Sequence, residues 1–336
     1  MPEPVLRIED LSISFRLGGR EVDVVRDLTV DLEPGRTLAV VGESGSGKTI
    51  TGRSIMRLLP PSARASGRIT AAGIDVLSAD EKAVRRLRGG DVAMVFQDSL
   101  SALSPYLSVG AQIVQAVRLH DGRVSRRMAR ERAVEMLDRV GIPDPSAAAG
   151  RYPHEFSGGM RQRAVIAMAL VNRPALLLAD EPTTALDVTV QAQILALLRD
   201  LQDEYGMAMM LISHDFGVVA AAADDVLVMY AGREAEYGTL RDVFVEPAHP
   251  YTAGLRAATP RLDVGERTRL QAIPGAPTSL REAGDGCAFA PRCEFAAQLG
   301  DRCLVERPVP TGRAGHGPHR AACHLDRLPA LQEAAR

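Results

Sequence analysis

The chain has 336 residues, of which 46% are hydrophobic and 24% charged, a globular balance that excludes a wholly disordered protein. Lys plus Arg number 40 and Asp plus Glu number 42, so the net charge of -2 lacks the basic surplus of proteins that mainly bind nucleic acid, and we expect no nucleic-acid partner. No apolar run reaches about 18 residues, which predicts no membrane-spanning helix. The N-terminus has no basic segment followed by an apolar stretch, so we expect no signal peptide and a cytosolic chain.

Short apolar runs separated by Gly and polar turns predict strands near the N-terminus. They lie at Val5–Phe15, Val22–Leu32, Thr37–Val41 and Ser66–Val76. Later apolar runs lie at Val92–Phe96, Ala175–Ala179, Met207–Ile212 and Val226–Tyr230. Helical patterns separate these later runs, which is the βα alternation typical of a buried parallel sheet. The sequence therefore predicts an α/β fold.

Two segments depart from this alternation. Between residues 98 and 172 helical periodicity dominates, as in Gln112–Val117 and Val124–Val140, which predicts a helical subdomain inserted into the α/β core. After residue 245 proline, glycine and arginine become frequent and regular patterns thin out. We therefore divide the chain into a domain over 1–245 and a small irregular C-terminal appendage over 246–336.

A glycine-rich motif follows the apolar strand at Thr37–Val41. Residues 42–49 read Gly-Glu-Ser-Gly-Ser-Gly-Lys-Thr and match the phosphate-binding loop G-x-x-x-x-G-K-[ST], and a helical stretch, Thr49–Leu59, follows. Glycines let the backbone aim N–H groups at phosphate oxygens, and the helix adds its positive end. The expected nucleotide ligands are Gly42, Ser44, Gly45, Gly47, Lys48 and Thr49, with the Lys48 charge on the β and γ phosphates and the Thr49 hydroxyl on Mg²⁺.

Two carboxylates follow the apolar run that ends at Ala179. An Asp at this place in phosphate-loop ATPases holds the Mg²⁺ shell, so we assign Asp180 that role. Glu181 would then face the γ-phosphate and polarise the attacking water. On its own the pair is better interpreted as a strand cap with two solvated acids, but the complete phosphate loop upstream favours the catalytic interpretation.

The sequence Ser157-Gly158-Gly159-Met160-Arg161-Gln162-Arg163 resembles the signature motif of ATP-binding-cassette (ABC) ATPases, and further motifs of that family follow the family order. Gln97 resembles the Q-loop glutamine, which also ligates Mg²⁺, and Ala185-Leu186-Asp187 resembles the D-loop. His214 resembles the switch histidine, and Phe15 the aromatic that stacks on adenine. The resemblance covers roughly 1–245 and implies catalytic roles for Glu181, His214 and Gln97.

The resemblance implies a P-loop ABC ATPase core with an N-terminal antiparallel β subdomain and an inserted helical subdomain. In this family the signature residues Ser157, Gly158 and Gly159 bind the γ-phosphate of the ATP held by the opposite subunit, and the resemblance also makes Asp187 a nucleotide-binding residue. One chain then forms half of each site, and a dimer closes over two ATP molecules. Closure driven by ATP and released by hydrolysis converts binding energy into motion.

Three stretches resemble the oligopeptide, dipeptide and nickel importer branch. They are Phe96–Pro105, Pro153–Arg163, and His249-Pro250-Tyr251-Thr252 followed by Ile273-Pro274-Gly275. The first departs from the branch pattern, which has Pro where this chain has Ser99 and Asn where it has Ser104, so the exact membrane partner stays open. The resemblance implies an ATPase at the cytoplasmic face of the membrane that powers di- or oligopeptide uptake.

That branch works with two permease subunits, a second ATPase subunit, identical or homologous, and an extracytoplasmic solute-binding protein. Nickel or glutathione-like solutes are alternatives to peptides. A soluble ABC ATPase of DNA repair or chromosome structure is a rival, but the gap of about 108 residues between Thr49 and Ser157 holds no sustained heptads. A module that binds ATP without hydrolysing it is a weaker rival because Glu181 is present.

Four cysteines cluster in the appendage, at Cys287, Cys293, Cys303 and Cys323. In a cytosolic chain such a cluster reads first as a metal site, and four thiolates are what a [4Fe–4S] cluster needs. The flanking sequence resembles the C-terminal region of peptide-importer ATPases, where such clusters occur. Zinc, aided by His316, His319 or His324, and free or disulfide-bonded cysteines remain alternatives. We expect this site to be independent of ATP binding, because the nucleotide residues belong to the other domain.

Overall fold

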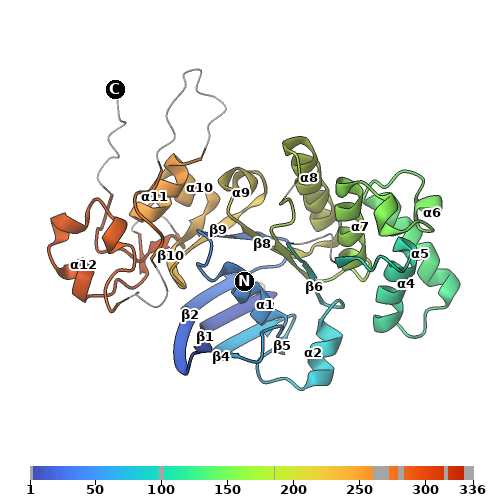
Figure 1. Ribbon diagram of the computed structural model, residues 1–336, viewed down its shortest axis with the longest axis horizontal. Helices are drawn as coiled ribbons and strands as arrows, with labels where there is room; N and C mark the ends of the chain where they lie inside the picture. The colour runs from blue at the N-terminus through green and yellow to red at the C-terminus, as the bar shows by residue number, and fades with distance from the viewer. Residues whose placement is uncertain are drawn as a thin grey trace.

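The computed structural model describes residues 3–97, 102–184, 186–259, 272–278, 284–313 and 317–328. The described strands form two sheets, of four and eight strands. We call them the N-terminal sheet and the main sheet. Figure 1 shows the N-terminal sheet below the main sheet, and helices to the left and right of the main sheet.

The N-terminal sheet is antiparallel, with the strand order β2-β1-β4-β5. Its strands are β1 Leu6–Leu17, β2 Arg20–Leu32, β4 Ala63–Ala71 and β5 Ile74–Asp75. The sequence predicted one strand over Ser66–Val76, but a turn divides it. Ala72 and Gly73 in that turn have φ values of 47° and 77°, a left-handed conformation that no strand continues through.

The main sheet has the strand order β11-β12-β10-β9-β3-β8-β7-β6. Its strands are β3 Thr37–Val41, β6 Val92–Val95, β7 Leu176–Asp180, β8 Ala208–Ser213, β9 Asp225–Tyr230, β10 Arg233–Thr239, β11 Thr311–Gly312 and β12 Arg320–Ala321. The five neighbours from β9 to β6 are parallel, as the βα alternation predicted, and β10, β12 and β11 add to them antiparallel. Parallel pairing brings the carboxyl ends of these strands to one edge of the sheet.

Both faces of the parallel strands are buried, which explains their continuous apolar runs. Leu177 and Leu211 pack into the cluster formed with the helical subdomain. Leu178 and Ile212, one position further along, pack into the cluster shared with the N-terminal sheet. Alternation of side chains along each strand therefore joins the two subdomains through one sheet.

The helices fill the connections. They are α1 Lys48–Ile55, α2 Glu81–Leu87, α4 Val109–His120, α5 Arg126–Arg139, α6 Pro145–Ala148, α7 Gly158–Leu170, α8 Val188–Tyr205, α9 Phe216–Ala222, α10 Leu240–Val245, α11 Pro250–Ala257 and α12 Arg302–Val305, with 3-10 turns at Pro153–Glu155, Ala290–Arg292 and Ala296–Leu299. The predicted helix over Thr49–Leu59 ends at Ile55, because Arg57 turns left-handed with φ of 50°. The helical insertion appears as α4 to α7 within the described residues. Among the described residues, none of the helices combines the length and apolar character needed to cross a bilayer.

The C-terminal appendage packs against the main sheet (Figure 1). Glu236 and Tyr237 on β10 pair with Ala321 and Arg320 on β12. Tyr251 and Phe289 also pack with β9 in one apolar cluster. Contacts therefore cross the boundary expected at residue 245, although the division into domains there stays a prediction.

Candidate functional site

The phosphate loop lies between β3 and α1. Gly42 has a φ of 150°, and a Cβ there would lie 2.2 Å from the Met229 carbonyl oxygen, so only glycine fits. Lys48 Nζ donates to the carbonyl oxygens of Gly42 at 2.7 Å and Glu43 at 2.9 Å. Burial lowers the pKa of Lys48, and the acids at 180 and 181 oppose that shift. The lysine is thus held inside its own loop, while Ser44 and Gly45 are exposed at the loop's tip.

Thr49 and Asp180 lie together at the carboxyl edge of the main sheet. The Thr49 hydroxyl donates to Asp180 Oδ1 at 3.1 Å. Asp180 ends β7 and is 1% exposed, and this burial raises its pKa despite the Thr49 hydrogen bond. A hydroxyl and a carboxylate oxygen are ligands that Mg²⁺ accepts. The pair fits the Mg²⁺ role predicted for it, which stays a prediction.

Glu181 is held in one orientation by three side chains from three segments. Gln97 Nε2 donates to Glu181 Oε2 at 2.8 Å, the Thr184 hydroxyl donates to the same oxygen at 2.9 Å, and His214 Nδ1 lies 2.9 Å from Oε1. Glu181 has a φ of 49°, a conformation that non-glycine residues seldom adopt outside functional sites. The structure therefore brings together Gln97, Glu181 and His214, which lie far apart in the sequence, and their catalytic roles stay predictions.

These contacts keep Glu181 ionised. Burial alone would raise its pKa, but the hydrogen bonds from His214 and Thr184 outweigh it and hold the pKa of Glu181 below its usual value. Sequence reasoning missed Thr184. The available signal was its position three residues after Glu181, where a turn brings its hydroxyl back to the carboxylate.

Ser157 and Asp187 cap two helices that begin side by side. The Ser157 hydroxyl accepts from the Met160 N–H at the start of α7, and Asp187 accepts from the Val190 N–H at the start of α8. A Cβ on Gly159 would lie 3.1 Å from the Val190 side chain, so the two helix ends are in contact. Among the described residues, no hydrogen bond or ion pair joins Ser157 or Asp187 to the phosphate loop.

Parts of two predicted motifs lie outside the described residues, namely 98–101 after Gln97 and Ala185 before Asp187. Gly158 lies exposed at the first turn of α7. Phe15 is half-buried on β1, where it pairs with Val22 and packs against the core cluster shared with the N-terminal sheet. Adenine stacking by Phe15 stays a prediction.

The four cysteines line one small cavity, together with His249 and His324. No disulfide joins them, and burial raises the pKa of each thiol. Cys303 lies on α12, and its carbonyl oxygen accepts a hydrogen bond from the Cys287 N–H at 2.8 Å. Within the described ranges, no group of three or more His, Cys, Asp or Glu side chains is arranged to hold a single metal ion.

The histidines divide between two places. His324 lines the cysteine cavity. His319 instead lies 2.8 Å from Glu236 on β10, and both side chains are buried. His316 lies outside the described residues. The arrangement therefore leaves His324 and His249 as the described histidines beside the thiols.

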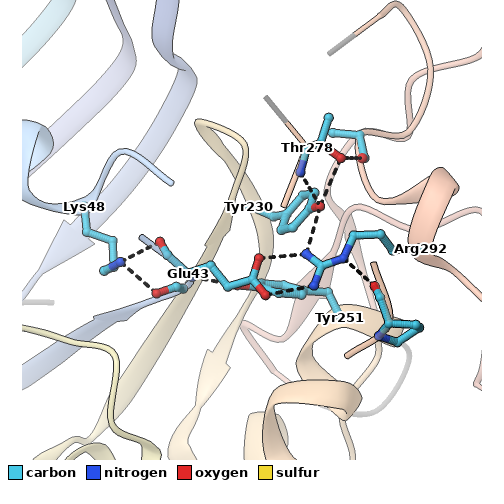
Figure 2. Close-up of polar contacts among 9 residues, drawn as sticks. Glu43, Lys48, Tyr230, Tyr251, Thr278 and Arg292 are labelled. Atoms are coloured by element: carbon cyan, nitrogen blue, oxygen red, sulfur yellow. Dashed lines mark hydrogen bonds and ion pairs between the residues drawn. The ribbon is translucent and has the colours of Figure 1, made fainter. Parts of the chain in front are cut away.

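The appendage also reaches the phosphate loop, contrary to the expected independence of the two sites. Arg292, one residue before Cys293, forms an ion pair with Glu43 of the loop at 2.7 Å, and Tyr251 binds the same residue (Figure 2). This contact joins positions 249 residues apart, which no local sequence pattern could indicate.

Two family models and several known proteins match this chain. The model of the "ABC transporter" family matches residues 25–184, and that of the "Oligopeptide/dipeptide transporter, C-terminal region" matches 235–299. A putative peptide import ATP-binding protein of Brucella abortus is 52% identical over 311 residues, which cover 88% of this chain and 91% of that protein. The oligopeptide transport ATP-binding protein OppD of Salmonella typhimurium is 48% identical over 301 residues, which cover 89% of each chain.

A solved structure gives the same fold. It is a dimeric ATP-binding cassette in a post-hydrolysis state bound to ADP and phosphate, 26% identical in sequence with a TM-score of 0.63. The match covers 70% of this chain and 99% of that one. The structure of cbiO1 from Clostridium perfringens, described as part of the ABC transporter complex cbiONQ, has a TM-score of 0.63 and 27% sequence identity. The match covers 73% of this chain and 92% of that one.

Proposed function

Because this chain belongs to the ATP-binding-cassette transporter family and is an ATPase of that family, we propose that it powers the import of di- or oligopeptides through separate permease subunits. The observation that carries the hydrolytic part is the Glu181 carboxylate, held by Gln97, Thr184 and His214 beside the phosphate loop. The relatives named for peptide import or oligopeptide transport support the peptide substrate.

The residues of the site divide the work of hydrolysis. Lys48 and the loop N–H groups bind the β and γ phosphates, and the Thr49 hydroxyl, the Asp180 carboxylate and Gln97 are the proposed Mg²⁺ ligands. Mg²⁺, bound with ATP, neutralises the phosphate charge. Glu181 orients a water molecule and takes its proton as the water oxygen attacks the γ-phosphorus, and ADP leaves with the former bridging oxygen. The lowered pKa of Glu181 keeps its carboxylate ionised, the form that can accept a proton.

His214 supports Glu181 from the exposed side of the site. Its Nδ1 lies beside Oε1, and its side chain is 63% exposed, so its other ring nitrogen can reach a phosphate at the surface. Proton transfer needs a base with a fixed lone-pair direction, which the three contacts on Glu181 supply. His214 is therefore proposed as the residue that links the γ-phosphate to the base.

A second ATPase subunit completes each site in this proposal. The exposed start of α7 offers the Ser157 hydroxyl and the helix N-terminus to an anion held by a partner. Asp187 lies at the neighbouring start of α8 and would contact the same interface. The dimeric cassette among the similar structures supports such an assembly.

The remaining partners follow from the transporter family. We propose two transmembrane permease subunits, a solute-binding protein outside the membrane that acts through them, and a location at the cytoplasmic face of the membrane. The C-terminal region matched over 235–299, described for oligopeptide and dipeptide transporters, supports the peptide-importing branch.

For the cysteines we propose a [4Fe–4S] cluster held by Cys287, Cys293, Cys303 and Cys323. Four thiols around one cavity fit the ligand number of such a cluster. A zinc ion held by the same thiolates is the alternative. The raised pKa values mean that loading must displace thiol protons, as metal binding does generally. The cluster would stabilise the appendage and takes no part in hydrolysis.

The experiment is purification from membranes followed by transport in proteoliposomes. We expect the chain to co-purify with two permeases, and ATP to drive uptake of labelled di- and oligopeptides when the solute-binding protein is present. Lys48→Ala should abolish uptake by weakening ATP binding, while Glu181→Gln should abolish it with ATP still bound. ATP-driven uptake of another solute class, with peptides ignored, would overturn the peptide assignment and leave the ATPase assignment intact.

A further inference from the structure

Glu43 of the phosphate loop is held at three of its groups. Its N–H donates to the Tyr251 hydroxyl at 2.7 Å, and its carbonyl oxygen accepts from Lys48 Nζ at 2.9 Å. Its carboxylate forms two bonds to Arg292, at 2.7 and 3.0 Å (Figure 2). Two of these three partners lie after residue 245, and the third is the lysine expected to bind phosphate. Glu43 therefore links the appendage to the phosphate-binding lysine.

Arg292 is itself fixed before it meets the loop. Its side chain is 4% exposed, and its Nε donates to the Pro274 carbonyl oxygen at 2.8 Å. Its guanidinium also lies 3.3 Å from the Tyr230 hydroxyl and packs over the Phe289 ring. A planar guanidinium held on one edge offers its other edge to a carboxylate in a fixed direction. The appendage thus presents a rigid cation to the loop.

Charge explains why the loop needs this cation. Glu43 is an acid in a loop that must accept a polyanionic triphosphate, and Asp180 and Glu181 already lie near Lys48. An unpaired carboxylate there would repel the phosphates and compete for Lys48, with little screening because the site is partly buried. Arg292 removes that charge and restrains the segment whose carbonyl holds the lysine.

We propose that Arg292 is a positioning residue for ATP binding, which neutralises and fixes Glu43 and so lets the loop present Lys48 to the phosphates. The proposal rests on the ATP site described above. It makes the cysteine appendage part of the nucleotide site's support. Since coupling between two sites is reciprocal, bound ATP also stabilises the docked appendage.

The test is a double-mutant cycle on the full-length chain, read by the dissociation constant of Mg²⁺ with a non-hydrolysable ATP analogue. Arg292→Gln should weaken binding about 3- to 30-fold, the range of coupling expected through a packed network. Arg292→Lys keeps the charge but loses the bidentate geometry, so its dissociation constant should lie between those of the wild type and Arg292→Gln. In a Glu43→Gln background, Arg292→Gln should change binding by less than about 2-fold, because no carboxylate remains to neutralise.

Arg320→Gln is the matched control. Arg320 also ties the appendage to the main sheet, through a partly buried ion pair with Glu234 at 2.6 Å, but it does not touch the loop. Arg320→Gln should lower the thermal midpoint and leave ATP-analogue binding unchanged. The proposal would be overturned if Arg320→Gln weakened ATP-analogue binding as much as Arg292→Gln does. It would also be overturned if Arg292→Gln weakened binding equally in the wild-type and Glu43→Gln backgrounds.

Lys48→Ala separates this proposal from the site on which it rests. If Lys48→Ala weakens analogue binding strongly while folded Arg292→Gln leaves it unchanged, the ATP site stands and the role of Arg292 is refuted. If Lys48→Ala has no effect, the assigned ATP site fails, and the proposal for Arg292 fails with it. Arg292→Lys keeps the test decisive should Arg292→Gln not fold.

Discussion

The ATP site and the cysteine appendage are built in different ways. The ATP site uses the ends of regular elements: Asp180 ends β7, and Lys48 begins α1. The appendage has few regular elements within its described residues, and its longest described strand has two residues. Its shape depends on individual contacts such as Arg292 with Glu43 and His319 with Glu236. Topology therefore positions the first site, whereas single side chains position the second.

This difference predicts different responses to substitution. In the ATP site a mutation should remove one chemical function and leave the framework intact, because the strands carry the geometry. In the appendage a mutation should first change the positions of neighbouring side chains, and it should affect a chemical function only through that change in position. The predictions below test that contrast.

The largest effect is expected at Glu181. Glu181→Gln removes the proposed base while keeping hydrogen bonds to Gln97 and Thr184, so turnover should fall about 10²-fold or more with ATP and Mg²⁺ binding retained. The measurement is ATPase activity of the assembled transporter beside analogue binding. Near-normal ATPase activity in this variant would refute the assignment of Glu181.

Variants of Ser157 and Lys48 should distinguish binding of ATP by one subunit from contact with the ATP of the opposite subunit. Lys48→Ala should weaken ATP binding by the chain alone about 10- to 100-fold, the scale of a charged hydrogen bond. Ser157→Arg should leave that binding intact but block ATP-driven dimer formation, measured by light scattering in a Glu181→Gln background. If Ser157→Arg weakens binding by the monomer as much as Lys48→Ala does, the two motifs serve one subunit's site.

For the appendage, the first prediction concerns the metal content of the purified protein. Protein purified without oxygen should be brown, absorb near about 400 nm, and carry about four iron and four sulfide per chain. Serine at any of the four cysteines should strip or destabilise the cluster. One zinc per colourless chain would favour the zinc alternative, and metal-free protein would exclude both.

Cysteine variants also test how far the appendage is coupled to the ATP site. Cys293→Ser alters the residue next to Arg292 and should weaken ATP-analogue binding modestly, about 2- to 5-fold, through displacement of the guanidinium. Cys323→Ser should lose the same cluster without altering a neighbour of Arg292, so it separates loss of the cluster from a local change beside the guanidinium. Complete loss of binding in both variants would mean that the appendage is needed to fold the cassette itself.

The smallest expected effect is the contribution of His249 to the pH dependence of the free energy of unfolding. Burial, with the nearby Arg313, lowers the pKa of His249 to about 3, and its Nδ1 accepts the Tyr251 N–H at 3.0 Å, which requires the neutral ring. As pH falls below about 6.5, the unfolded chain binds a proton that the folded chain refuses, so the free energy of unfolding drops by about 1.4 kcal/mol per pH unit until about pH 3. His249→Asn, whose amide oxygen can accept the same N–H, should lose this contribution.

Comparison of urea midpoints at pH 7.0 and 5.5 would measure the effect. The wild type should lose more stability over this interval than His249→Asn, by about 1 kcal/mol. An equal loss in both proteins would show that His249 protonates without unfolding its surroundings.

Sequence patterns predicted the parallel strands and the residues at their ends, because motif spacing and βα alternation are local features. The structure places Thr49 beside Asp180 and His214 beside Glu181, with Lys48 near both acids, while their roles stay predictions. Patterns could not predict β10 pairing with β12, because that pairing joins segments more than 80 positions apart without apolar alternation. The Arg292 contact with Glu43 was invisible for the same reason. Helix α1 was predicted too long because the left-handed turn at Arg57 leaves no compositional sign.

The position of β12 late in the chain has a consequence for the edge of the main sheet during synthesis. β10 has seven residues and would form an open sheet edge until the chain reaches Arg320. An uncovered edge of that length offers unpaired N–H and C=O groups on which another chain can assemble. β12 covers its centre at Glu236 and Tyr237, and β11 beyond it has only two residues, too short to act as a template in turn. The short strand β12 thus protects the cassette against edge-to-edge aggregation.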